Sequence, residues 1–317
     1  MKIVVIGGYG HIGSYLVPKL VKLGNEVIAI SRHERQPYVD DWAWQSAKFV
    51  ALDRNDTKTF TQKLTELDAD VVIDLVNFRF ENTKEIVTAL KKTKLSHYLF
   101  CSSVWAHGRA QVLPVDPNGV KAPLDEYGKN KYQSERYLKE EYRQNGFPAT
   151  VIMPGQISGP GWDIINPEGN QNRQVFQDIA DGKQITLPNF GMETLHHVHA
   201  SDVAQQFVDA IQHRNQALGE SFHAVSSNSI TLYGYARLMY KFFHQEAKID
   251  FLPWPDWVTK LDSPVDSDKT YYHIARSGQY SIENAKKLIG YHPQYSVEET
   301  IKLSIRGAVN RGVIKVK

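Results

Sequence analysis

A glycine-rich segment directly after the first apolar run is the feature that most constrains how this chain folds. Residues 2–6 read Lys-Ile-Val-Val-Ile, a β-branched run typical of a buried parallel strand. Gly8, Gly10 and Gly13 follow with G-x-G-x-x-G spacing, and a helical pattern of leucines begins at Leu16. A strand, a tight turn and a helix in this order are typical of a dinucleotide-binding unit, whose helix N-terminus holds a pyrophosphate.

We therefore expect the glycine segment to contact a dinucleotide cofactor through Gly7, Gly10, His11, Ile12 and Gly13. The glycines would allow a tight turn and a close approach of the backbone to the phosphates. The alternative is a glycine-rich turn that only packs a helix against a strand.

The end of the second expected strand, at residues 26–30, suggests which dinucleotide is bound. An NAD site usually carries an acidic residue here, which binds the ribose 2′-hydroxyl. This chain has Ser31 and Arg32 instead. Arg32 suits a 2′-phosphate and Ser31 can add a hydrogen bond, so the pattern favours NADP. NAD remains the alternative, because an arginine here can also stack on the adenine.

Strands alternate with helical segments through the first half of the chain. Further strands are predicted at residues 49–53, 71–76, 98–102 and 151–154. This alternation predicts an α/β fold, a Rossmann-like doubly wound parallel sheet. Ligands bind at the carboxyl ends of such strands, so Asp53, Asn77 and Pro154 are candidate cofactor contacts. Asp53 and Asn77 equally suit turn or cap positions.

The strand–helix pattern loosens after residue 158. We expect residues 1–158, with about 196–225, to form the NAD(P)-binding domain. Residues 159–195 and 226–317 would form a smaller C-terminal substrate-binding subdomain, which covers the carboxyl edge of the sheet. Within it, residues 251–270 are rich in proline, tryptophan and aspartate and are predicted to be irregular.

Tyr127 and Lys131 are the candidate catalytic pair. One helical turn separates them, so both side chains would share a helix face. A phenol is a weak acid, with a reference pKa of about 10, and a nearby ammonium is expected to lower that pKa toward neutrality. Ser103 follows the fifth strand, where it would orient the reacting oxygen. Tyr127 would then exchange a proton, and Lys131 would also bind the nicotinamide ribose. The alternative makes Ser103 a turn residue and Tyr127 a partly exposed aromatic.

Composition excludes several other classes of protein. The 317 residues carry a net charge of +2, which argues against nucleic acid as a main partner. Cys101 is the only cysteine, so no disulfide framework or cysteine-based metal site is expected. No apolar run is long enough to span a membrane, and we expect a cytoplasmic protein. His196, His197 and His199 fit no standard metal-binding spacing, so we expect structural roles and no metal.

Taken together, these motifs resemble the extended or atypical short-chain dehydrogenases/reductases, the NAD-dependent epimerase/dehydratase family. The glycine motif, Cys101-Ser102-Ser103 and the Tyr127–Lys131 segment are similar to the family's motifs, as are residues 198–204 and 281–293. The resemblance implies an oxidoreductase or an epimerase/dehydratase that acts on a hydroxyl or carbonyl of a small, sugar-like substrate, such as a nucleotide sugar. It also allows a homodimer.

Some residues depart from the family pattern. Ile6 stands where the family often has threonine, and the chain between the fourth and fifth strands is short, as in atypical members. That shortened form also resembles the chloroplast stem-loop-binding branch. The alternative function is therefore a dinucleotide-binding regulatory or RNA-binding protein with little turnover. The intact Tyr127–Lys131 pair favours catalysis.

Overall fold

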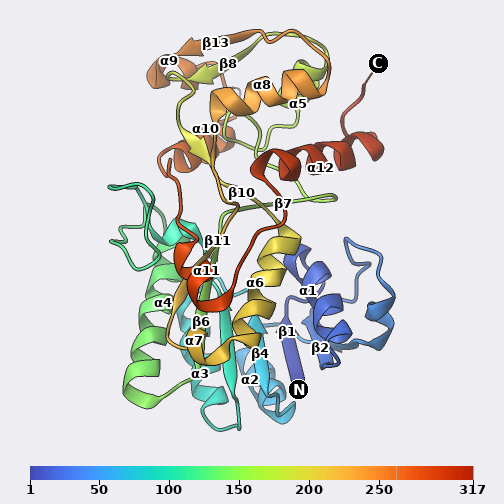
Figure 1. Ribbon diagram of the computed structural model, residues 1–317, viewed down its shortest axis with the longest axis vertical. Helices are drawn as coiled ribbons and strands as arrows, with labels where there is room; N and C mark the ends of the chain where they lie inside the picture. The colour runs from blue at the N-terminus through green and yellow to red at the C-terminus, as the bar shows by residue number, and fades with distance from the viewer. Residues whose placement is uncertain (262, 317) are drawn as a thin grey trace.

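A seven-stranded parallel sheet forms the centre of the molecule (Figure 1), with strand order β11-β6-β5-β4-β1-β2-β3. The computed structural model describes residues 1–261 and 263–316. The strands are β1 (Lys2–Ile6), β2 (Glu26–Ser31), β3 (Lys48–Ala51), β4 (Val71–Asp74), β5 (His97–Cys101), β6 (Ala149–Pro154) and β11 (Ser221–Ala224). The order reverses direction between β1 and β4, which places a crevice at the carboxyl ends of these strands. The predicted α/β Rossmann-like fold is confirmed.

Both faces of this sheet are buried, which explains why its strands are almost continuously apolar. Ile3 and Val5 belong to one core, and the alternate residues Val4 and Ile6 belong to the core on the opposite face. The first core is covered by α1 (His11–Lys22), α6 (Ala200–Gln212), α7 (Arg214–Ala217) and α11 (Glu283–Ile289). The second is covered by α2 (Thr57–Glu66), α3 (Phe80–Leu90) and α4 (Glu126–Asn145).

A third apolar core lies outside the sheet. Figure 1 shows its elements above the end of the sheet opposite the N-terminus, so they lie over the carboxyl ends of the strands. Its helices are α5 (Gln174–Ala180), α8 (Leu232–Phe242), α9 (Trp254–Val258), α10 (Pro264–Ile274) and α12 (Val297–Asn310). The short strands of this region are β8 (Ile185–Pro188), β9 (Thr194–Leu195), β12 (Ile230–Thr231) and β13 (Ile249–Leu252). Strands β7 (Gln156–Ser158) and β10 (His197–His199) pair with each other and pack against the first core. Two 3₁₀ turns, η1 (Trp42–Ser46) and η2 (Val104–Ala106), complete the elements.

Several sequence-based boundaries differ from the structure. The third and fourth strands end at Ala51 and Asp74, before the predicted ends at residues 53 and 76. The prediction that residues 251–270 are irregular is wrong, because α9 and part of α10 lie there with prolines in their first turns. Proline is tolerated at that position, where its missing N–H has no partner to lose.

The division into a cofactor domain and a substrate subdomain remains a prediction. Residues 280–291 would belong to the substrate subdomain, yet Tyr280, Ile289 and Tyr291 pack in the core beside the sheet. None of the helices in the described part of the chain combines the length and apolar character that crossing a bilayer requires.

Candidate functional site

The glycine segment forms a tight turn between β1 and α1. Gly7 has φ +84°, in the left-handed region that side chains disfavour. A Cβ atom on Gly13 would strike the Gly8 carbonyl oxygen, so only glycine fits there. Helix α1 begins after Gly10, and the N–H groups of its first turn, from His11 onward, lack partners within the helix. This geometry suits an anion, and the binding of a pyrophosphate here remains a prediction.

An open cavity of ≈ 530 Å³ lies beside this turn. Gly7 and Gly10 line it on one side, and Ser31, Arg32 and Asp53 line it at the ends of the neighbouring strands. Three further arginines join Arg32 in the lining, namely Arg35, Arg54 and Arg79. A cavity with this excess of guanidinium groups suits a ligand that carries several phosphates.

Two polar residues of this cavity are already engaged in local contacts. The Ser31 hydroxyl donates to the His33 carbonyl oxygen at 2.5 Å, so towards a ligand it can only accept. The Asp53 carboxylate accepts the Asn55 N–H at 2.9 Å, in the turn role considered as its alternative. Arg54 pairs with the buried Asp74 at 2.5 Å. Arg32, Arg35 and Arg79 are exposed.

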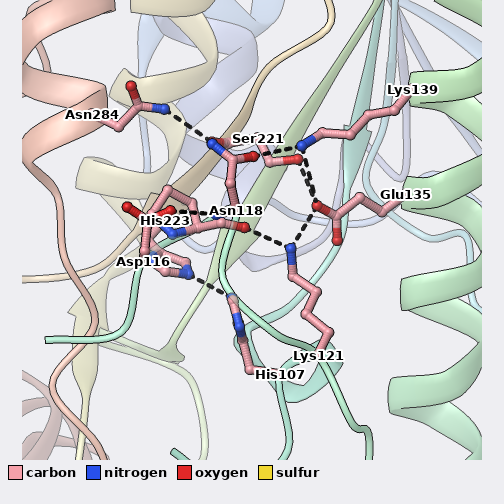
Figure 2. Close-up of polar contacts among 10 residues, drawn as sticks. His107, Asp116, Asn118, Lys121, Glu135, Lys139, Ser221, His223 and Asn284 are labelled. Carbon is pink, nitrogen blue, oxygen red and sulfur yellow. Dashed lines mark hydrogen bonds and ion pairs between the residues drawn. The ribbon is translucent and has the colours of Figure 1, made fainter. Parts of the chain in front are cut away.

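Helix α4 carries Tyr127 and Lys131 on successive turns. Asp125 caps the helix and accepts the Gly128 N–H at 2.8 Å, which fixes the turn that holds Tyr127. One turn beyond Lys131, the buried Glu135 carboxylate accepts Lys121 and the Ser221 hydroxyl, both at 2.7 Å. Figure 2 shows Glu135 at the centre of this network, between α4, the loop of Lys121 and strand β11. The network anchors α4 against the edge of the sheet.

Lys131 is completely enclosed by protein. Its ammonium donates to the main-chain oxygens of Asn77 and Cys101, both at 2.6 Å. The rings of Phe78 and Phe100 lie about it, with centroids at 5.1 and 5.0 Å. Burial lowers the pKa of Lys131 to about 8, so the group is mostly charged at pH 7.

Tyr127 does not have the lowered pKa that the sequence suggested. Burial raises the pKa of the phenol well above 10, and the nearby Ser103 hydroxyl acts in the opposite direction. Trp105 packs edge-on against the Tyr127 ring, at 5.8 Å between centroids. Removal from water is the largest cause of this shift, and the Lys131 ammonium is already held by two carbonyls. In this state Tyr127 is a neutral phenol, suited to donating a proton.

A second cavity, of ≈ 350 Å³, brings Ser103 and Tyr127 together. Ser103 caps η2, and its hydroxyl oxygen accepts the Trp105 N–H at 3.2 Å. The other lining residues come from η2, from residues 155–157 after β6, from the loop after β7 and from α10: Trp105, Gly155, Gln156, Ile157, Trp162, Asp163, Ile165, Gln171 and His273. Trp162 also lines the first cavity and thus lies at the boundary of the two.

Comparison with known proteins identifies the family to which this chain belongs. Residues 3–224 match the model of the NAD dependent epimerase/dehydratase family, which is most of the chain. The chain belongs to this family. The resemblance inferred from the sequence motifs is confirmed. Membership of this family supports an NAD-dependent enzyme.

Several known proteins and solved structures are similar to this chain. The chloroplast stem-loop binding protein of 41 kDa b from Arabidopsis thaliana is 27% identical over 99% of this chain and 81% of its own length. The UDP-glucose 4-epimerase of Lactobacillus helveticus is 26% identical over 51% of this chain and 54% of that protein. The structure of the UDP-glucuronic acid 4-epimerase from Bacillus cereus, in complex with UDP-glucuronic acid and NAD, shares the fold. It has a TM-score of 0.75 at 19% identity, covering 98% of this chain and 100% of the other.

Four other residues were predicted to contact the cofactor, and the structure places them as follows. The Asn77 side chain is buried and donates to Asp74 and Thr83, so it faces neither cavity, and its main-chain oxygen holds Lys131. Pro154 is buried at the end of β6, and Gly155 beside it lines the second cavity. Ile12 is buried in the first turn of α1. The His11 ring stacks on Trp162 at 5.0 Å, and burial lowers its pKa to about 3. His11 therefore offers a phosphate its backbone N–H and no positive charge.

The clustered histidines near β10 make contacts within the protein. The His196 ring bonds to the Ser226 carbonyl at 2.9 Å, and the His197 ring bonds to the Ser158 hydroxyl at 2.9 Å. His199 accepts the Ser201 N–H and caps α6.

Sequence reasoning did not single out Arg35, Arg79, Gln156 or His273, which line the two cavities. The sequence offers a signal for Arg35, which lies three residues after Arg32.

Proposed function

We propose that this chain is an NAD(P)-dependent enzyme that interconverts a hydroxyl and a carbonyl on a small, sugar-like molecule. The reaction class is reduction, epimerisation or dehydration. One observation carries the proposal: Ser103 and Tyr127 line one cavity, while Lys131 lies one helical turn from Tyr127 along α4. A serine, a neutral phenol and a fixed cation in this order suit proton exchange with a substrate oxygen.

Each of the three residues has a separate task in this proposal. Tyr127 donates its proton to the substrate oxygen during reduction and takes it back during oxidation. Ser103 orients that oxygen by a hydrogen bond. Lys131, charged at pH 7, stabilises the phenolate that forms when Tyr127 loses its proton. Burial raises the pKa of the resting phenol, so the phenolate is costly to form and depends more on the nearby Lys131 ammonium.

The residues beside the glycine turn fit a dinucleotide. A Cβ atom on Gly13 would strike the Gly8 carbonyl oxygen, and four arginines line the cavity beyond the turn. The cofactor would supply hydride transfer when bound. The exposed Arg32 and Arg35 favour NADP over NAD, because either guanidinium can pair with a 2′-phosphate.

The proposal is tested by mixing the protein with NADPH or NADP⁺ and a panel of sugars and nucleotide sugars. A change in nicotinamide absorbance, or isomerisation found by product analysis, is the expected result. Absence of both, with NADPH bound, would contradict an enzymatic role.

A second candidate is an RNA-binding protein with little turnover. It is favoured by the Arabidopsis stem-loop binding protein, which matches 99% of this chain. This alternative predicts saturable binding of a stem-loop RNA that is insensitive to Tyr127→Phe. A homodimer is a further expectation, which sedimentation velocity can test.

A further inference from the structure

We propose that the buried Asp74 is a positioning residue, whose carboxylate keeps the Lys131 ammonium charged and fixes the carbonyl group that holds it. The inference rests on the proposed function, in which charged Lys131 stabilises the Tyr127 phenolate. Asp74 is the last residue of β4 and lines neither of the two cavities described above. It therefore acts through Lys131 and not on a ligand.

Lys131 is a buried cation whose hydrogen-bond partners are uncharged. Its ammonium donates to the main-chain oxygens of Asn77 and Cys101, and its side chain is shut off from water. An ammonium that has left water is costly unless a charge of opposite sign acts on it. A carboxylate close to this site is therefore expected to decide how firmly the lysine holds its proton.

Asp74 supplies such a charge, and Asn77 links it to the lysine. Its Oδ2 accepts the Asn77 side-chain amide at 3.0 Å, and the main-chain oxygen of Asn77 accepts the Lys131 ammonium at 2.6 Å. The Tyr98 hydroxyl also donates to Oδ2, at 2.9 Å. Asp74 is 0% exposed, so water does not screen its charge, and electrostatic effects reach further in such an interior than in solvent. The same contact to Asp74 fixes Asn77, which holds Lys131.

Arg54 is a second cation that shares this carboxylate. Its Nη2 pairs with Oδ1 of Asp74 at 2.5 Å. One buried carboxylate thus serves two cations, Arg54 and Lys131. Burial lowers the pKa of Lys131 to about 8, while the charge of Asp74 acts to raise this pKa and the charge of Arg54 acts to lower it further. The two charges therefore have opposite effects on the lysine, which gives the inference a test by sign.

The other titratable groups around Lys131 are neutral near pH 8. Burial raises the pKa of the Cys101 thiol to about 11. Burial also raises the pKa of the Tyr98 phenol and of the Tyr127 phenol well above 10. Charged Asp74 and Arg54 are therefore the groups expected to shift the titration of Lys131.

The test follows Lys131 itself, by NMR of protein that is isotopically labelled at lysine Cε, with the signal assigned by its loss in Lys131→Arg. Asp74→Asn keeps the size of the side chain and removes its charge. A lysine is charged below its pKa, so loss of the carboxylate should move the titration, and the alkaline decline of kcat, to lower pH by roughly half a unit or more. A residue that only stabilised the fold would lower kcat at every pH without moving that decline.

Two further variants make the test decisive. Arg54→Gln keeps a donor for Asp74 and removes a positive charge, so the titration of Lys131 should move the other way, to higher pH. Thr83→Val removes a neutral acceptor of the Asn77 amide and should leave the titration at its wild-type pH.

A folded Asp74→Asn variant in which Lys131 titrates as in the wild type would overturn the proposal, as would an equal shift in Thr83→Val. If Asp74→Asn does not fold, the absence of an upward shift in Arg54→Gln would overturn it. The NMR titration needs no turnover, so a failure of this inference is distinguishable from a failure of the proposed enzymatic function.

Discussion

The ammonium of Lys131 lies 5.5 Å from the centre of the Tyr127 ring, one turn further along the same helix. Two main-chain carbonyls hold this ammonium, so its position is fixed before any ligand arrives. A fixed cation beside a buried phenol offsets the cost of forming a phenolate away from water. The predictions about catalysis follow from this pair.

Lys131→Met should lower both turnover and NADPH affinity, because the variant removes the charge that supports Tyr127 and the group proposed to bind the nicotinamide ribose. Turnover should fall by about a hundredfold or more, the usual range for a group that assists acid–base catalysis. Lys129→Met is the matched control, since Lys129 is exposed on the same helix and pairs with the exposed Glu126. Its steady-state kinetics should match those of the wild type.

Turnover should decline as the pH rises through about 8. Burial lowers the pKa of Lys131 to about 8, so the lysine is charged below that value and neutral above it. Loss of the charge removes support for the Tyr127 phenolate. A profile of kcat against pH, measured with saturating cofactor, tests this, and a flat profile from pH 7 to 10 would refute the role of Lys131.

Arg32→Ala should remove most of the preference for NADPH over NADH. We expect NADPH affinity to fall roughly ten- to a hundredfold, the range for a charge-assisted contact, while NADH affinity changes little. Arg306→Ala, on the exposed side of α12 and outside the lining of the cofactor cavity, is the control. Calorimetry that gives equal wild-type affinities for the two cofactors would show that the preference does not exist.

Glu135→Ala should destabilise the fold by about 3–5 kcal/mol, because it removes the carboxylate that pairs with the buried Lys121 ammonium and leaves it the uncharged Pro117 carbonyl oxygen as acceptor. Lys121 and Glu135 side chains are 4% and 2% exposed, so water cannot replace the lost contact. Glu140→Ala, which removes an exposed carboxylate from the same helix, should change the free energy of unfolding by less than about 0.5 kcal/mol. Urea unfolding of both variants makes the comparison, and equal midpoints would contradict the anchoring role of Glu135.

The sequence predicted the parallel sheet well because its signals are local. The apolar run at residues 2–6 and the glycine spacing act within a few residues of one another, and the structure has β1, the turn and α1 there. Strand β11 was not predicted, since residues 221–224 become a strand only by pairing with β6. The proline-rich stretch after residue 251 was read as irregular, although two of its prolines lie in the first turns of helices.

Prediction of the candidate site was less complete, because burial is not visible in a motif. The spacing of Tyr127 and Lys131 indicated a pair on one helix face, which the structure has. It gave the wrong direction for the pKa of Tyr127, since desolvation depends on how Trp105 and its neighbours enclose the phenol. Asn77 lies just after β4, as expected, but its side-chain amide, predicted to contact the cofactor, donates to Asp74 and Thr83.

The most direct test of the catalytic role of Tyr127 is Tyr127→Phe, measured for both turnover and NADPH binding. The substitution removes the hydroxyl and keeps the ring that packs against Trp105. We predict that NADPH affinity and the free energy of unfolding stay near wild-type values, while turnover of an identified substrate falls by about 10²–10⁴-fold. Wild-type turnover in this variant would contradict the assignment of Tyr127 as the proton donor.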